Sequence, residues 1–127
     1  RIIVRDPDAG EDEFIALAER LGRDGVSYAI GYTAWLDIAP HGVDKAHGLA
    51  RVCARVGLAA ADVLAVGDGR NDVEMLAWAG RGVAMANAPA EVRALADAVT
   101  GTVADGGLIA ELARWFPGVP RPSALPG

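Results

Sequence analysis

The amino-acid sequence predicts an α/β fold in which a parallel β-sheet carries flanking helices. Between residues 45 and 116, short apolar runs alternate with helical patterns about ten residues long, an order typical of βαβ units. Residues 1–36 break this alternation with a strand–helix–strand–strand order, so they predict a separate α+β element. The composition, with 52% hydrophobic and 23% charged residues among 127, is that of a chain that buries a core.

The α+β element begins with a predicted strand over residues 1–4, where β-branched side chains precede a turn cluster at residues 6–10. A helix is expected over residues 11–23, because its apolar residues recur three or four positions apart. Two adjacent strands are expected over residues 26–32 and 34–39, which are rich in β-branched and aromatic side chains.

The parallel part begins with a helix over residues 45–56, bounded by an Asp44 N-cap and by Gly57 at the position of a helix-ending glycine. The continuous apolar run at residues 63–66 predicts a strand that is covered on both faces. The remaining expected elements are a helix from Val73 to Gly80, a strand over residues 83–86, a helix that Pro89 opens and that runs to Ala96, a strand over residues 99–100, and a helix that Asp105 caps and that runs to Phe116.

Charge and hydropathy exclude several classes of protein. A formal net charge of −5 without a run of basic residues argues against nucleic acid as a partner. The apolar stretches are far shorter than the roughly 18 residues of a membrane span, and the first residues lack the apolar region of a signal peptide. The single cysteine, Cys53, is expected in the core of a protein from a reducing compartment, so the sequence predicts a cytoplasmic location.

The hexapeptide at residues 67–72, Gly-Asp-Gly-Arg-Asn-Asp, lies between a predicted buried strand and a helix. Its glycines allow a tight turn, while Asp68, Asn71 and Asp72 bring two carboxylates and an amide to the amino end of that helix. Mg²⁺ suits such a site, because it binds one or two carboxylates together with water and substrate phosphate oxygens. The alternative is a Gly-Asp turn that ends in an ordinary helix cap.

Lys45 is the second signal, since it directly follows the capping residue of its helix. A cation at a helix amino terminus opposes the helix dipole, so a local account would favour an acidic residue there. A phosphate would be attracted both by the ammonium group and by the free N–H groups of the first turn. The alternative is an exposed lysine whose stem lies along the surface.

Three runs, Leu36–Lys45, Val66–Leu76 and Ala79–Ala88, together resemble the carboxyl-terminal half of a haloacid dehalogenase-superfamily phosphatase of the Cof type, which carries a large C2 cap. The resemblance implies a Rossmann-like core over residues 37–116, preceded by the end of the cap over residues 1–36 and followed by a Pro- and Gly-rich tail over residues 117–127. It also implies Mg²⁺-dependent hydrolysis of a small phosphorylated metabolite, such as a sugar phosphate.

The resemblance also assigns roles to individual positions. Lys45 corresponds to the lysine that binds the transferring phosphoryl group, and Asp68 corresponds to an aspartate that ligates Mg²⁺. Asn71 corresponds to a residue that hydrogen-bonds the phosphate. Asp72 corresponds to a second acidic residue, which supports the metal's water shell and the lysine and is counted with Asp68 as a metal-site residue. Asn87 and Ala88 correspond to a loop that closes one side of the site.

The amino-terminal nucleophile motif of this superfamily, Asp-x-Asp-x-Thr or Val, has no good counterpart. Asp6 and Asp8 have the right spacing, but Gly10 stands where Thr or Val belongs, so a turn in a cap loop is the preferred interpretation. The sequence therefore predicts a fragment of a phosphatase that is inactive alone. The alternative is a non-catalytic remnant that binds phosphate or a partner and that self-associates through an exposed sheet edge. P-type cation pumps share the hexapeptide pattern but require membrane helices.

Overall fold

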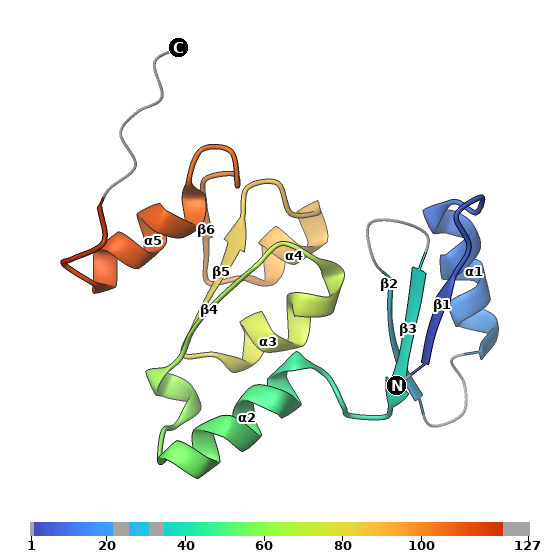
Figure 1. The fold of residues 1–127 in the computed structure, drawn as a ribbon, viewed down its shortest axis with the longest axis horizontal. Helices are drawn as coiled ribbons and strands as arrows, with labels where there is room; N and C mark the ends of the chain where they lie inside the picture. The colour runs from blue at the N-terminus through green and yellow to red at the C-terminus, as the bar shows by residue number, and fades with distance from the viewer. Residues whose placement is uncertain (1, 22–25, 31–34, 121–127) are drawn as a thin grey trace.

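The computed structural model describes residues 2–21, 26–30 and 35–120, and the chain in these ranges forms an antiparallel sheet with one helix and a parallel sheet with several (Figure 1). The strands are β1 (Ile2–Arg5), β2 (Val26–Ile30), β3 (Trp35–Pro40), β4 (Leu64–Gly67), β5 (Arg81–Met85) and β6 (Ala98–Thr100). The α-helices are α1 (Glu11–Leu21), α2 (Lys45–Val56), α3 (Val73–Trp78), α4 (Ala90–Leu95) and α5 (Gly107–Trp115), and two 3-10 turns are η1 (Ala60–Asp62) and η2 (Arg70–Asp72).

The first unit confirms the predicted α+β element. Its sheet has the order β1-β3-β2 with antiparallel pairing, and Val4 and Ile30 flank Leu36 in register. Phe14 and Ala18 of α1 bury Leu36 against one face of this sheet. The predicted boundary at residue 36 falls inside β3, which continues to Pro40. The division into cap and core therefore stays a prediction, while the sheet itself extends four residues further. The predicted helix end at residue 23 and strand residues 31–34 lie outside the described residues.

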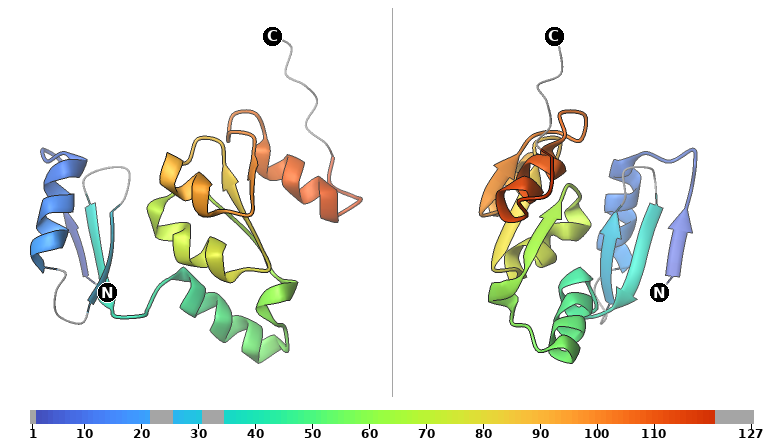
Figure 2. Two further views of the ribbon diagram at one scale, coloured as in Figure 1. Left: turned by 180° about the vertical axis from the view of Figure 1, so that it is seen from behind. Right: turned by 60° about the vertical axis from the view of Figure 1, so that its left-hand side comes forward.

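The second unit confirms the predicted parallel sheet, with strand order β4-β5-β6 and parallel pairing throughout. Its strands begin one or two residues away from the predicted positions. Leu76 of α3 and Val92 of α4 are buried against Ala65 and Ala84 of the sheet. Figures 1 and 2 show α3 and α4 on one side of this sheet and α5 on the other. Among the described residues, no helix combines the length and the apolar character that a membrane crossing needs.

Helix α2 has the predicted ends. The Asp44 carboxylate accepts a hydrogen bond of 2.8 Å from the His47 N–H, and Gly57 adopts the left-handed φ of 75° that ends the helix. Cys53 is buried as expected.

The chain also comes very close to itself at Gly82, where an added Cβ would lie 2.1 Å from the Leu76 carbonyl oxygen. Only glycine allows α3 to end that close to β5.

The prediction that Asp105 caps the last helix is wrong. Helix α5 begins at Gly107, and its N-cap position is held by Gly106, which adopts a left-handed φ of 70°. Asp105 is thus displaced by one residue, and its carboxylate accepts a hydrogen bond of 2.5 Å from the Thr102 hydroxyl instead. The turn places Gly107 against the chain at Gly101, where an added Cβ would lie 2.1 Å from the Gly101 carbonyl oxygen.

A partly buried ion pair joins the start of β5 to α5. Arg81 donates to both carboxylate oxygens of Glu111, through Nε at 2.7 Å and through a terminal nitrogen at 3.3 Å. The Trp115 indole donates to the same carboxylate at 3.1 Å, and the Arg81 guanidinium lies 5.9 Å from the centroid of that ring. Glu111 is only 3% exposed. The hydrogen bond from Arg81 is the main cause that lowers the pKa of Glu111.

We predict that Glu111→Gln destabilises the chain near neutral pH by about 2 kcal/mol, because it removes a charge-assisted hydrogen bond. A carboxyl whose pKa is lowered on folding stabilises the fold above its unfolded pKa, and that contribution is lost as the pH falls through the lowered value. The difference in unfolding free energy between the two proteins should therefore shrink in acid. Urea denaturation at several pH values measures it, and a difference that stays constant down to acidic pH would contradict the assignment.

Candidate functional site

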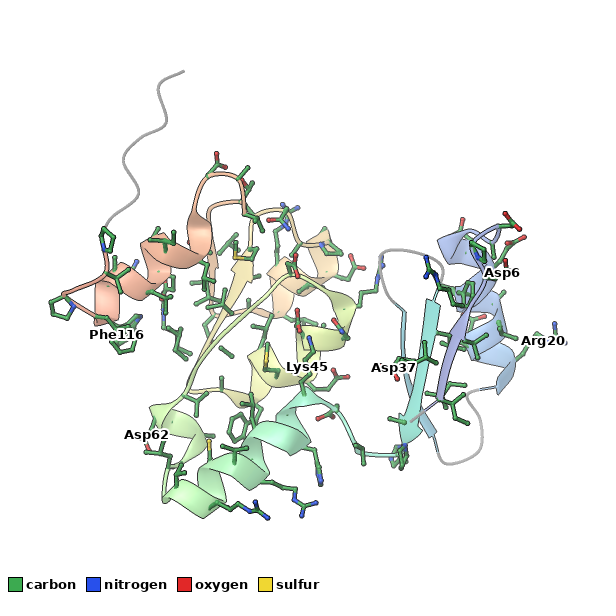
Figure 3. All side chains as sticks on the ribbon, viewed as in Figure 1. Asp6, Arg20, Asp37, Lys45, Asp62 and Phe116 are labelled. Carbon is green, nitrogen blue, oxygen red and sulfur yellow. The ribbon has the colours of Figure 1, made fainter. Side chains whose placement is uncertain are left out.

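The predicted hexapeptide forms the connection from β4 to η2, at the carboxyl end of the parallel sheet. Gly67 ends β4, and an added Cβ there would lie 2.6 Å from the Asp72 Cβ, so the chain folds back on itself closely. Ligand sites of parallel sheets lie beyond this end of the strands. Figure 3 shows Lys45 at the start of α2, facing the part of the molecule where this connection runs.

The Asp72 carboxylate links the predicted site residues. One oxygen accepts a hydrogen bond from the Lys45 ammonium group in an ion pair. The other accepts hydrogen bonds of 2.9 Å from the Asp68 N–H and 3.0 Å from the Gly69 N–H. Asp72 is 5% exposed, and its charge is satisfied by these three donors. Lys45 and Asp68, which are far apart in sequence, therefore meet at one buried side chain.

The exposure of Lys45 agrees with the alternative of a surface lysine, and its contact with a phosphate stays a prediction. Its side chain is 48% exposed, as a surface lysine would be, but its ammonium group is anchored on Asp72. A cation at the amino terminus of a helix is repelled by the helix dipole, and the first turn of α2 contains no acidic residue. The ion pair with Asp72 offsets this repulsion. The ammonium group is thus held in place by Asp72 on a side chain that is partly open to solvent.

Asp68 lies half-buried directly after β4, and its carboxylate accepts a hydrogen bond of 3.2 Å from the side-chain amide of Asn87. Asn87 follows β5, the neighbouring strand. The sequence analysis gave this residue only a place in a closing loop. A stronger signal was available, because polar residues that follow adjacent parallel strands meet at the same edge of the sheet.

The other two residues of the hexapeptide are exposed. The Asn71 side-chain oxygen lies over Gly69, where an added Cβ would be 2.6 Å away, and its predicted contact with phosphate stays a prediction. Arg70 donates through Nε to the Glu91 carboxylate at 2.8 Å, in an exposed ion pair that ties the connection to α4. The pKa of Glu91 is lowered first by a hydrogen bond from the Glu91 backbone N–H. The hydrogen bond from Arg70 lowers this pKa further.

Asp6 is not brought to this site. Its carboxylate accepts a hydrogen bond of 3.0 Å from the Asp8 N–H, and the Gly10 N–H donates to Glu13 at 3.0 Å, so the segment forms a turn that leads into α1. Figure 3 places Asp6 at the distant side of the first unit from Lys45. The geometry agrees with the preferred turn interpretation.

The donors present suit a metal ion that takes few protein ligands. In the part of the chain that the structure describes, no three His, Cys, Asp or Glu side chains gather into a set that could hold a metal. Asp68 offers a half-buried carboxylate that accepts a hydrogen bond from Asn87, and both oxygens of the buried Asp72 carboxylate accept hydrogen bonds. Mg²⁺ commonly binds one or two carboxylates and completes its shell with water and substrate phosphate. Asp68 fits that requirement, and Asp72 fits a supporting position.

Known proteins are similar to this chain in sequence and in fold. A family model described as haloacid dehalogenase-like hydrolase matches residues 2–112. The phosphoglycolate phosphatase of Natronomonas pharaonis is 41% identical over 102 residues, which are 80% of this chain and 43% of that protein. A solved phosphatase of the haloalkanoate (HAD) enzyme superfamily from Bacteroides thetaiotaomicron has a TM-score of 0.70 and 34% identity, covering 84% of this chain and 39% of its own. A solved HAD subclass IIB sugar phosphatase has a TM-score of 0.72 and 29% identity, covering 84% and 40% respectively. The chain thus spans less than half the length of these three proteins.

We predict that Asp72→Asn destabilises the chain by about 2 kcal/mol, because the amide has one acceptor oxygen where the carboxylate has two. Asp62→Asn is a matched control, since the Asp62 carboxylate accepts one bond of 2.9 Å from the Ala59 N–H in the similar turn η1 but is exposed. Its loss should stay below about 1 kcal/mol. Urea denaturation measures the loss of unfolding free energy in both variants. Equal losses would show that the ion pair between Asp72 and Lys45 does not contribute to stability.

Proposed function

Because the chain belongs to the haloacid dehalogenase-like hydrolases, we propose that it forms the phosphate- and metal-binding half of a Mg²⁺-dependent phosphomonoester hydrolase. The observation that carries the proposal is the convergence of Lys45 and Asp68 on the buried carboxylate of Asp72. The similar proteins include a phosphoglycolate phosphatase and a sugar phosphatase. We therefore propose a small phosphorylated metabolite of the sugar-phosphate type as the substrate.

Lys45 supplies the charge that a phosphate needs. Its ammonium group projects from the amino terminus of α2, where the helix dipole also favours an anion. Asp72 fixes the position of the ammonium group, and Asn71 beside it offers an amide N–H₂ as a further donor to phosphate oxygens. Asp68 would hold Mg²⁺, which would supply a second positive charge next to the phosphate. The two cationic centres would stabilise the charge that the phosphoryl oxygens carry in the transition state.

The attacking group, we propose, is an aspartate in a part of the complete protein outside this chain. Its carboxylate oxygen bonds to phosphorus while the bond from phosphorus to the leaving alcohol oxygen breaks, and the alcohol departs with a proton. Water then attacks the aspartyl-phosphate, which releases phosphate and restores the aspartate. The distance of Asp6 from Lys45, visible in Figure 3, supports this placement of the nucleophile.

In the complete protein that contains this chain, Asp68→Asn should lower kcat/KM for a phosphate monoester by about 10²–10³-fold, because one stabilising charge is lost from the transition state. Asp62→Asn, which removes a carboxylate at the opposite end of the second unit in Figure 3, should leave the rate unchanged. Steady-state kinetics with and without Mg²⁺ measure both. Normal Mg²⁺-dependent turnover by the Asp68 variant would refute the proposed role.

The 127-residue chain by itself should show no multiple-turnover hydrolysis of p-nitrophenyl phosphate, with or without Mg²⁺. The reason is that its candidate nucleophile, Asp6, lies in a turn apart from the phosphate site. A phosphate-release assay on the purified chain decides this. Turnover that disappears in Asp6→Asn would place the nucleophile inside the chain and contradict the proposal.

A further inference from the structure

Asn87 joins three connections at the carboxyl end of the parallel sheet. Its side-chain amide donates to the Asp68 carboxylate after β4 at 3.2 Å, while its side-chain oxygen accepts a bond of 3.1 Å from the Val103 N–H after β6. Both functional groups of one side chain are therefore committed in opposite directions. The donor group faces the carboxylate that the proposed function assigns to the metal.

The loop that carries Asn87 is held without this side chain. The Ala86 N–H donates to the Gly101 carbonyl at 3.3 Å, and the Ala88 N–H donates to the Met85 carbonyl at 3.0 Å. The Arg93 guanidinium donates to the Ala86 carbonyl at 2.9 Å. Ala88 is in addition buried. Backbone hydrogen bonds, the bond from Arg93 and the burial of Ala88 already fix the loop. The Asn87 side chain is therefore not required to shape it.

The Asn87 side chain instead contacts the Asp68 carboxylate. Asp68 follows the last residue of β4, and its backbone N–H donates to Asp72. The hydrogen bond from Asn87 to one carboxylate oxygen favours particular rotamers of the Asp68 side chain. An amide donor achieves this without bringing a second charge next to a cation. An exposed hydrogen bond of this kind adds about 1 kcal/mol or less to the free energy of unfolding. We therefore expect the bond to act mainly on the orientation of the Asp68 carboxylate.

We propose that Asn87 is a positioning residue that orients the Asp68 carboxylate toward a divalent cation. The proposal rests on the proposed function, because it takes Asp68 as the cation ligand. Partners that orient a metal ligand in this way typically contribute about 10- to 100-fold to metal affinity.

The test is a titration of the 127-residue chain with Mn²⁺, an oxygen-seeking divalent ion whose paramagnetism broadens nearby NMR signals. The broadening of the Gly69 amide signal reports binding beside Asp68. We expect Asn87→Ala to weaken Mn²⁺ binding by about tenfold.

Thr102→Ala is the matched control. It removes a hydroxyl that bonds to Asp105 in the loop next to Val103, and it does not touch Asp68. If Asn87 mattered only through this loop, Thr102→Ala would weaken Mn²⁺ binding as much as Asn87→Ala does. This result, or unchanged binding in Asn87→Ala, overturns the proposal. Hydrogen exchange at the Val103 amide shows directly whether the loop has opened.

Asp68→Ala separates this proposal from the proposed function. If Asp68→Ala binds Mn²⁺ as well as the unmodified chain, the metal assignment fails, and the role of Asn87 fails with it. If Asp68→Ala loses binding while Asn87→Ala retains it, only the positioning role of Asn87 is refuted.

Discussion

Three donors from two separate stretches of the chain converge on the Asp72 carboxylate: the Lys45 ammonium group and the backbone N–H groups of Asp68 and Gly69. A buried carboxylate without such partners would carry a desolvation cost of several kcal/mol, so the connection after β4 and the start of α2 must lie together in the folded chain. The same constraint requires glycine at residue 67, where a side chain would collide with Asp72. The geometry of the site is thus a consequence of satisfying one buried charge.

The two ends of the parallel sheet differ in burial and in the kind of side chains they carry. At the amino end of β5, the buried Glu111 carboxylate accepts hydrogen bonds from the partly exposed Arg81 and the exposed Trp115, and the bond from Arg81 fastens α5 to the sheet. At the carboxyl end, polar side chains such as Asp68 and Asn87 lie in half-buried or exposed loops. Because the amino end is packed, the carboxyl end can expose polar and charged side chains. Exposed charges contribute little to the free energy of unfolding.

The first unit lies beside this polar end. Strand β2 passes close to η2, which carries Arg70 and Asp72, and Figures 1 and 2 show the antiparallel sheet standing next to the second unit on that side.

The sequence by itself determined the features that depend on neighbouring residues. Asp44 and Gly57 marked both ends of α2, the apolar run before Gly67 marked a strand, and the hexapeptide marked the site. The family resemblance already implied that Asp72 supports Lys45, whereas the tertiary structure alone decided that Asn87 reaches Asp68 and that Arg81 pairs with Glu111. These contacts join residues 19 to 30 positions apart, and they depend on strand order and register, which no local pattern encodes.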